Sequence, residues 1–272
     1  MNNIMKNMFG LLFCWMGLIS LGHSHISYVA RDFGALDPSS SQVIVISSQT
    51  VTSDFGWASG TDANLGDSHK LRAFKFSMSQ SGDVQIRVEG LSFLKGSVSI
   101  SALLRPAFSV YQGLAHDGLD HDSSSISASY LNTTYGAGNW QGSFRALNDW
   151  KIGSDDGLTF ADLSSFTYVG NGADGSAANY GAAAGIFGDG KADGMVVQTL
   201  SLDPGSYSLF VGGAQYYDPL NTGGDATGSY GFSVTLTTIP EPSALSLFAV
   251  GLAGLAMARR RRTLSPITQQ AP

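Results

Sequence analysis

The strongest constraint on the fold of this chain is a series of short runs in which apolar and polar residues alternate. A period of two sends successive side chains to opposite faces of a strand, so each run is typical of a strand with one buried face. Gly, Asp, Asn and Ser separate the runs, as expected for turns. The predicted strands are Val43–Val51, Leu71–Met78, Val84–Val88, Val98–Leu104, Ala107–Tyr111, Val196–Leu202, Tyr207–Val211 and Tyr230–Leu236.

The length and composition favour a single β domain. The chain has 272 residues, 34 of them Gly, and only 13% are charged, about half the usual 25%. No helical pattern of twelve residues occurs outside the two ends. We therefore predict an all-β fold, a β-sandwich or jelly roll over residues 25–238. Pro106 favours a sheet edge or a break in its strand.

Residues 114–194 exceed what a minimal sandwich needs and are rich in Gly and Asp. Long structureless loops are uncommon inside compact domains. We expect this insertion to form extra strands or to pack on the sandwich through its apolar side chains. These are Phe144, Trp150, Ile152, Phe160, Leu163, Phe166 and Val169.

The first 24 residues have the pattern of a secretory signal peptide. Lys6 is their one charged residue, an apolar run follows from Met8 to Leu21, and small residues close the segment. Cleavage after Gly22 or Ser24 removes Cys14, the single cysteine, so the exported protein is expected to contain no disulfide.

The C-terminal region combines three elements. Pro240-Glu241-Pro242 precedes an uncharged segment, Ser243–Ala258, which is predicted to be a transmembrane helix. Arg259, Arg260, Arg261 and Arg262 follow, and the positive-inside rule keeps them cytoplasmic. Residues 263–272 then form a polar cytoplasmic tail.

This arrangement resembles the PEP-CTERM sorting signal of exopolysaccharide-producing Gram-negative bacteria. The resemblance implies Sec export, a transient inner-membrane anchor, and processing by an exosortase-like membrane protease that recognises this signal. It also implies release to the cell surface or extracellular matrix, with exopolysaccharide as an expected partner. Family members usually end soon after the basic cluster, so the ten-residue tail leaves the efficiency of processing open.

The body of the chain resembles a second family at the level of pattern. The segments Phe74–Val88, Pro106–Tyr111, Leu200–Val211 and Tyr230–Val234 are similar to strands of the bacterial pre-peptidase C-terminal β-sandwich. Members of that family are non-catalytic accessory domains of secreted proteins. The resemblance implies a role in surface attachment or secretion.

The acidic balance argues against nucleic acid as a partner. The net charge is −6, whereas a nucleic-acid binder presents a basic face. Without the two terminal signals, 10 basic and 20 acidic residues remain, a net charge near −10. Such a surface repels acidic polymers unless divalent cations bridge them.

The densest group of candidate metal ligands is His116, Asp117, Asp120, His121 and Asp122. Carboxylates suit Ca²⁺, the candidate cofactor, whereas His with Asp suits a transition ion. An ordinary solvated loop is the favoured alternative, because the spacing matches no established metal motif.

Two other loops contain Asp and Gly. In Phe187–Gly194, Lys191 stands where an EF-hand needs a ligand, so a simple Asp/Gly turn is favoured over a non-EF calcium turn. Asp218, Asn221 and Asp225 form a similar loop. Signal cleavage after Gly22 would place His25 third in the chain, where a copper chelate can form, but an incidental histidine is the favoured interpretation.

Aromatic residues beside polar loops offer candidate sugar contacts. These are Trp57, Trp140, Tyr216 and Tyr217. Exposed rings can stack on sugars, whereas large aromatic residues usually lie in the core.

The sequence contains no Gly-x-Ser-x-Gly or His-Glu-x-x-His motif, and outside the terminal signals Glu89 is the single Glu. We therefore expect no catalytic residues and a non-catalytic surface or matrix protein. The alternative is a secreted polysaccharide-modifying hydrolase that uses Asp residues. A structural matrix protein without a specific ligand is a third hypothesis.

Overall fold

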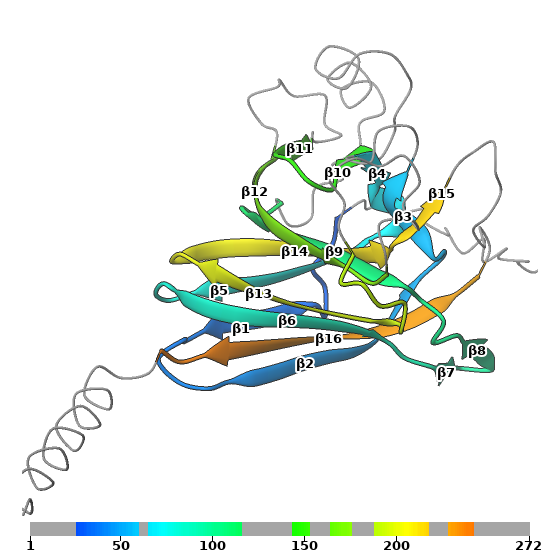
Figure 1. Ribbon diagram of the computed structural model, residues 1–272, viewed down its shortest axis with the longest axis horizontal. Helices are drawn as coiled ribbons and strands as arrows, with labels where there is room; N and C mark the ends of the chain where they lie inside the picture. The colour runs from blue at the N-terminus through cyan, green and yellow to red at the C-terminus, as the bar shows by residue number, and fades with distance from the viewer. Residues whose placement is uncertain are drawn as a thin grey trace, which may run out of the picture.

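The computed structural model describes residues 26–59, 65–115, 143–152, 164–175, 188–217 and 228–241. Within these ranges every regular element is a strand, except for one short 3-10 helix, η1 (Ser68–Lys70). The strands make two large sheets that face each other as two layers (Figure 1). The predicted all-β, sandwich-like fold is confirmed.

The larger sheet contains the central pair β14–β9. Its strands, in spatial order, are β1 (Asp32–Leu36), β5 (Arg72–Met78), β14 (Gly205–Gly213), β9 (Pro106–Gln112), β12 (Ser164–Ala173) and β11 (Trp150–Ile152). β1 is parallel to β5, and the other neighbours along this path are antiparallel. β3 (Phe55–Ser59) pairs with β14 and with β15 (Gln215–Tyr217).

The smaller sheet has four antiparallel strands. Their order is β13 (Met195–Leu202), β6 (Gly82–Gly90), β16 (Tyr230–Ile239) and β2 (Val43–Val51). Two short ribbons complete the described part of the chain. They are β4 (Leu65–Asp67) with β10 (Ser143–Arg145), and β7 (Phe93–Lys95) with β8 (Val98–Ile100).

Two tight connections carry the chain between the sheets. Residues 79–81 join β5 of the larger sheet to β6 of the smaller one, and Asp203–Pro204 joins β13 to β14. These sequence neighbours therefore lie in different layers and are not hairpin partners. The Ser and Asp residues expected at turns therefore lie where the chain crosses from one sheet to the other.

The main core lies between the two sheets. It is formed by alternate residues of the facing strands, for example Phe74 and Phe76 on β5 and Ile86 and Val88 on β6. All four side chains are buried, and burial of each such side chain contributes about 1.5–3 kcal/mol. The alternation seen in the sequence is therefore what places these residues inside.

The other face of the larger sheet is buried as well. Tyr111 on β9 lies among Phe144, Phe166, Tyr168 and Phe210, with ring centroids 5.7–6.1 Å from its own. Its hydroxyl donates to the carbonyl of Arg145. Phe144 on β10 and Phe166 on β12 belong to the predicted insertion, so the alternative of extra strands is confirmed for these segments.

A polar chain on this second face attaches the covering segments to β9. The indole N–H of Trp57 donates to Ser109 Oγ at 2.8 Å, and Ser109 donates to the carbonyl of Ala146 at 2.7 Å. Trp57 and Ser109 are fully buried. Buried polar groups of this kind require hydrogen-bond partners. Here Ser109 accepts from Trp57 and donates to Ala146.

The break expected at Pro106 is confirmed, because β8 ends at Ile100 and Pro106 is the first residue of β9. The alternative of a sheet edge was wrong, since β9 lies in the middle of the larger sheet. A proline without an N–H is tolerated as the first residue of a strand. The predicted strand Val98–Leu104 is shorter, because β8 ends at Ile100.

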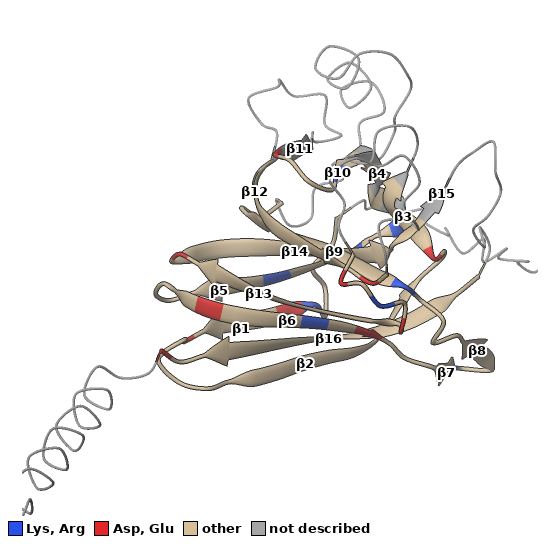
Figure 2. Ribbon diagram, viewed as in Figure 1, with Lys and Arg blue, Asp and Glu red and all other residues tan. Residues whose placement is uncertain are grey.

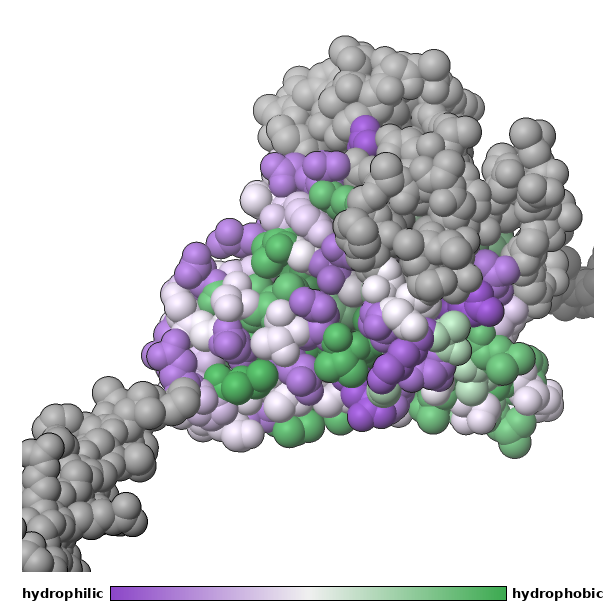
Figure 3. All heavy atoms as spheres, in the orientation of Figure 1, coloured by the Kyte–Doolittle hydropathy of each residue, from purple (hydrophilic) through white to green (hydrophobic). Residues whose placement is uncertain are grey.

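Exposed apolar side chains gather at one end of the molecule. Leu94, Val98 and Leu103 are 73%, 57% and 81% exposed, and Figure 3 shows hydrophobic residues over the β7–β8 end. Val43 and Val45 on the edge strand β2 are also exposed.

Ser109→Ala is expected to destabilise the protein by about 1–3 kcal/mol, because it leaves the buried Trp57 N–H and Ala146 carbonyl without their partner. Urea unfolding measures the change. Ser99→Ala is the control, since Ser99 is exposed on β8, and it should change stability by less than about 0.5 kcal/mol. Equal effects of the two substitutions would contradict the polar chain.

Candidate functional site

Three aspartates meet where β12 ends and the segment before β13 begins. Carboxylate oxygens of Asp174, Asp189 and Asp193 all lie within 4.8 Å of one another. Asp174 is fully buried, whereas Asp189 and Asp193 are exposed. We call these three residues the Asp cluster. Charged residues are otherwise sparse on the strands (Figure 2).

The backbone brings the two segments of the Asp cluster together. The N–H of Asp174 donates to the carbonyl of Pro106 at 2.9 Å, which extends the β9–β12 pairing by one residue. The N–H of Asp189 donates to the carbonyl of Ala173 at 2.9 Å, and that of Gly190 to Gly175 at 3.0 Å. Residues 189–190 therefore lie directly beside residues 173–175.

The Asp174 carboxylate organises the loop before β13. Its two oxygens accept N–H bonds from Asp193 at 3.0 Å and Gly194 at 2.9 Å. Asp189 Oδ1 accepts from Lys191 at 3.0 Å and Gly175 at 3.3 Å. The described residues 188–194 thus form an Asp/Gly loop closed by these bonds, and the choice between a simple turn and a calcium turn stays a prediction.

Electrostatics disfavours three charged carboxylates at this point. Burial raises the pKa of Asp174, and the nearby Asp189 and Asp193 raise it further. The N–H bonds from Asp193 and Gly194 act in the opposite direction but do not cancel the increase in its pKa. A proton or a bound cation would relieve this unfavourable charge.

The dimensions of the Asp cluster suit one hard cation. Ca²⁺ binds six to eight oxygens at about 2.3–2.6 Å, so two of its ligands are at most about 5 Å apart. The separations within 4.8 Å satisfy this limit. Carboxylate oxygens favour Ca²⁺ or Mg²⁺, whereas imidazole and thiolate ligands favour copper or zinc.

Sequence reasoning missed Asp174 as a member of this group. A local signal was present, because each residue of the Asp cluster precedes a glycine. Gly175, Gly190 and Gly194 all have positive φ, at 119°, 85° and 78°. Such conformations are accessible to glycine at little cost. The pairing of two segments 15 residues apart was not visible in the sequence.

The other predicted metal ligands lie outside the described residues. These are His116, Asp117, Asp120, His121 and Asp122, together with His25 and the loop from Asp218 to Asp225.

The candidate sugar contacts have different outcomes. Trp57 is fully buried and its N–H is bonded to Ser109, so its assignment as an exposed sugar-stacking residue was wrong. The reason is that β3 packs over the second face of the larger sheet. Tyr216 and Tyr217 form part of β15, and Trp140 lies outside the described residues.

The sorting residues begin where the sandwich ends. β16 ends at Ile239, and Pro240 and Glu241 follow it directly. Residues 238–262 match the model of the PEP-CTERM protein-sorting motif. The chain carries a PEP-CTERM sorting signal. The prediction from Pro240, Glu241, Pro242 and the four arginines is thereby confirmed.

The PEP-CTERM signal implies an exported protein that is sorted to the cell surface, and such signals are processed by exosortase, a membrane protein. Pro242 and Arg259–Arg262 lie outside the described residues. In the part of the chain that the structure describes, no helix is long and apolar enough to cross a bilayer. The predicted helix 243–258 falls outside that part.

Two solved structures are similar over most of the chain. One is CorA, described as a surface-associated copper-binding protein important in copper acquisition by Methylomicrobium album BG8. It is 15% identical with a TM-score of 0.46, over 79% of this chain and 98% of CorA. The other is MopE, a secreted protein of Methylococcus capsulatus in which an oxidised tryptophan facilitates copper binding. It is 17% identical with a TM-score of 0.39, over 78% of this chain and 87% of MopE. No curated protein sequence matches the chain.

The raised pKa of Asp174 predicts a pH dependence in metal-free protein. Between the ordinary Asp pKa, about 3.9, and the higher folded value, the folded protein retains a proton that the unfolded chain has lost. The free energy of unfolding therefore falls as the pH rises through this window. Urea unfolding in EDTA between pH 4 and 7 measures it.

Asp174→Asn should remove this part of the pH dependence, because an amide does not titrate. Asp203→Asn, which removes an exposed carboxylate elsewhere, is the control and should retain the trend of the unsubstituted protein. Identical pH profiles for Asp174→Asn and the unsubstituted protein would contradict the account.

Proposed function

We propose that this chain is a non-catalytic surface protein whose β-sandwich binds a divalent cation and associates with exopolysaccharide. The observation that carries the proposal is the PEP-CTERM motif at residues 238–262, which begins at the end of the last sandwich strand. Export through Sec and a transient anchor at residues 243–258 complete the proposed route. The sandwich acts as an accessory domain of the kind that the pre-peptidase C-terminal resemblance implies.

The position of β16 supports a role for the sandwich in surface attachment. β16 lies between β6 and β2 in the smaller sheet. It ends at Ile239, and Pro240-Glu241-Pro242 begins at the next residue. The chain therefore passes from a central strand of the sandwich to the sorting signal without an intervening linker.

Ca²⁺ is the cation proposed for the Asp cluster. Three carboxylates supply hard oxygen ligands, and the unfavourable charge that raises the pKa of Asp174 is the kind that a divalent ion offsets. One oxygen each from Asp174, Asp189 and Asp193 would hold the ion, and waters or carbonyls would complete its shell. Such an ion would tie the end of β12 to the start of β13 and so stabilise the larger sheet against the smaller one.

Association with exopolysaccharide is proposed from the surface destination and the charge of the domain. Residues between the two terminal signals have a net charge near −10. An acidic polymer approaches such a surface only where cations bridge it or where basic residues gather. Divalent cations would therefore strengthen the association.

Ca²⁺ should raise the melting temperature of metal-stripped protein, because the ion binds the folded state alone. At one hundred times its dissociation constant the stabilisation is about 2.7 kcal/mol. Asp189→Asn and Asp193→Asn should each abolish most of this increase. The amide introduced by Asp189→Asn would retain Oδ1 as the acceptor for Lys191 and Gly175, so the turn survives while the charge is lost.

Asp203→Asn, outside the cluster, should leave the response to Ca²⁺ unchanged. Mg²⁺ and Cu²⁺ are tested in parallel. A response to Cu²⁺ alone, or an undiminished Ca²⁺ response in both cluster variants, would contradict the proposed site.

The sorting part of the proposal is tested in cells by replacing Arg259–Arg262 with serine. Loss of the cytoplasmic positive charge should impair anchoring and processing. Cell fractionation and the mass of the released protein are the measurements. Replacement of the same four residues by lysine retains the charge and should retain the anchored topology. An unchanged fractionation and mass in the serine variant would contradict this role.

A further inference from the structure

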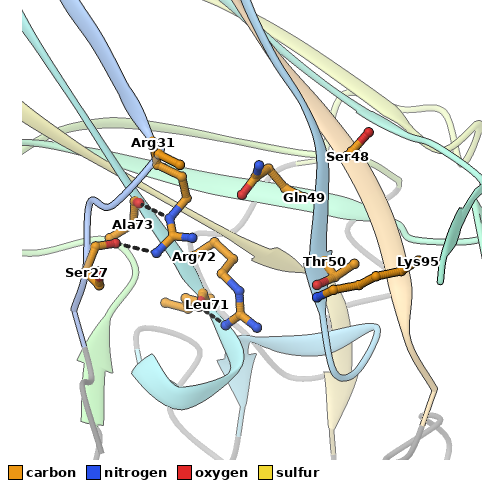
Figure 4. Close-up of a pocket in the computed structure, with 10 residues that line it drawn as sticks. Ser27, Arg31, Ser48, Gln49, Thr50, Leu71, Arg72, Ala73 and Lys95 are labelled. Atoms are coloured by element: carbon orange, nitrogen blue, oxygen red, sulfur yellow. Dashed lines mark hydrogen bonds between the residues drawn. The ribbon is translucent and has the colours of Figure 1, made fainter. Parts of the chain in front are cut away.

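A polar pocket of about 500 Å³ differs from the Asp cluster in the sign of its charge, because its charged residues are all basic. Arg31 lies just before β1, Arg72 begins β5, and Lys95 ends β7. Figure 4 shows Arg31 and Arg72 on one side of the pocket, with Gln49, Thr50 and Lys95 across from them. We call it the Arg pocket.

Among the residues that the structure describes, no acidic side chain balances these cations. None of the residues that line the Arg pocket is Asp or Glu. In the described part of the chain, the hydrogen bonds of both guanidinium groups are to backbone carbonyls, and neither group contacts a carboxylate. This is unusual for a domain with twice as many acidic as basic residues.

Arg31 is held in place by the backbone around it. Its Nε donates to the carbonyl of Ala73 at 2.9 Å, and Nη2 donates to that of Ser27 at 2.6 Å. Arg72 Nη1 donates to the carbonyl of Leu71 at 2.9 Å. Because a guanidinium has five N–H groups, both side chains retain donors for a ligand.

The wall opposite the arginines is an irregular part of an edge strand. The pairing of β2 with β16 shifts register between Phe232 and Val234, and Ser48 has a φ of 57°. A bulge of this kind turns side chains out of the regular alternation and often occurs beside binding sites. Here it accompanies Ser48, Gln49 and Thr50, which line the pocket, with Gln49 directed toward the arginines (Figure 4).

The two arginines are unfavourably placed without a counter-charge. Burial lowers the pKa of Arg31, with a further contribution from Arg72, and burial also lowers the pKa of Arg72. An anion between them would relieve both the desolvation and the repulsion. The geometry and the missing carboxylate thus indicate the same class of ligand.

We propose that the Arg pocket binds the carboxylate of an acidic sugar. Planar guanidinium groups match the two oxygens of a carboxylate. Gln49 and Thr50 supply amide and hydroxyl groups for the sugar hydroxyls. The volume lies within the range of about 300–1,000 Å³ typical of small-molecule sites, and no aromatic residue lines it for stacking on a nucleobase. The inference deepens the proposed association with exopolysaccharide and rests on it for the choice of a sugar.

The experiment is a calorimetric titration of the full chain, in a polyoxyethylene detergent that contains no sugar, with glucuronate and with glucose. These two probes differ at C6, where one has a carboxylate and the other a hydroxymethyl group. We expect saturable binding of glucuronate, weakened by added salt, and no detectable binding of glucose.

Arg72→Gln should weaken glucuronate binding about tenfold or more, because it removes a charged donor from a half-buried site. Lys95→Gln should weaken it by about two- to fivefold, since Lys95 is exposed. Lys191→Gln removes the same charge from the loop of the Asp cluster and should have no effect. Circular dichroism verifies that each variant is folded.

Inorganic phosphate and sulfate distinguish a sugar site from a general oxyanion site. Binding of these ions with equal or higher affinity than glucuronate would overturn the assignment to an acidic sugar. Absence of glucuronate binding, or full binding by Arg72→Gln, would overturn the pocket itself. Because the probes are monosaccharides, these outcomes are independent of whether the protein binds exopolysaccharide through another surface.

Discussion

Burial of both faces of β14 and β9 is the constraint on which the rest of the structure depends. One face of this central pair packs against the smaller sheet, through residues such as Phe108 and Leu209. On the other face, Trp57 of β3 and Phe144 of β10 pack in one cluster with the sheet residues Tyr111, Phe166 and Phe210. A sheet that is buried on both faces needs a third layer, and the insertion contributes Phe144 and Ala146 to it. Ser109 and Tyr111 hold that layer through hydrogen bonds to residues 145–146.

The same arrangement positions the two polar sites. The Asp cluster forms because β12, at the far side of β9, ends beside the loop that leads into β13. The Arg pocket forms where the entry to β1 and the start of β5 meet the bulged edge of the other sheet. In a chain with only 13% charged residues, these two sites bring like charges close together. A ligand of opposite charge at each site would relieve the repulsion.

Local pattern was sufficient to predict most of the sandwich but little of its sites. The alternation in Leu71–Met78 predicted the correct strand, because side-chain direction in a strand depends only on its period. Whether the Trp57 side chain is exposed or buried depends on which segment covers the second face, and that is a long-range property of the fold. Asp174 was missed for a related reason. The chain has five Asp-Gly pairs, and the sequence does not indicate which three of them lie close together in the fold. The PEP-CTERM signal was predictable in full, since recognition depends on a contiguous stretch of sequence.

We propose that the exported sandwich is a binding module and not an enzyme. The most direct test is cosedimentation of the purified protein with the exopolysaccharide of its own organism, in Ca²⁺ and in EDTA, with polymer length measured in the same samples. The account predicts saturable binding that is weaker in EDTA and a polymer of unchanged length. A shortened polymer, or no binding in Ca²⁺, would contradict it.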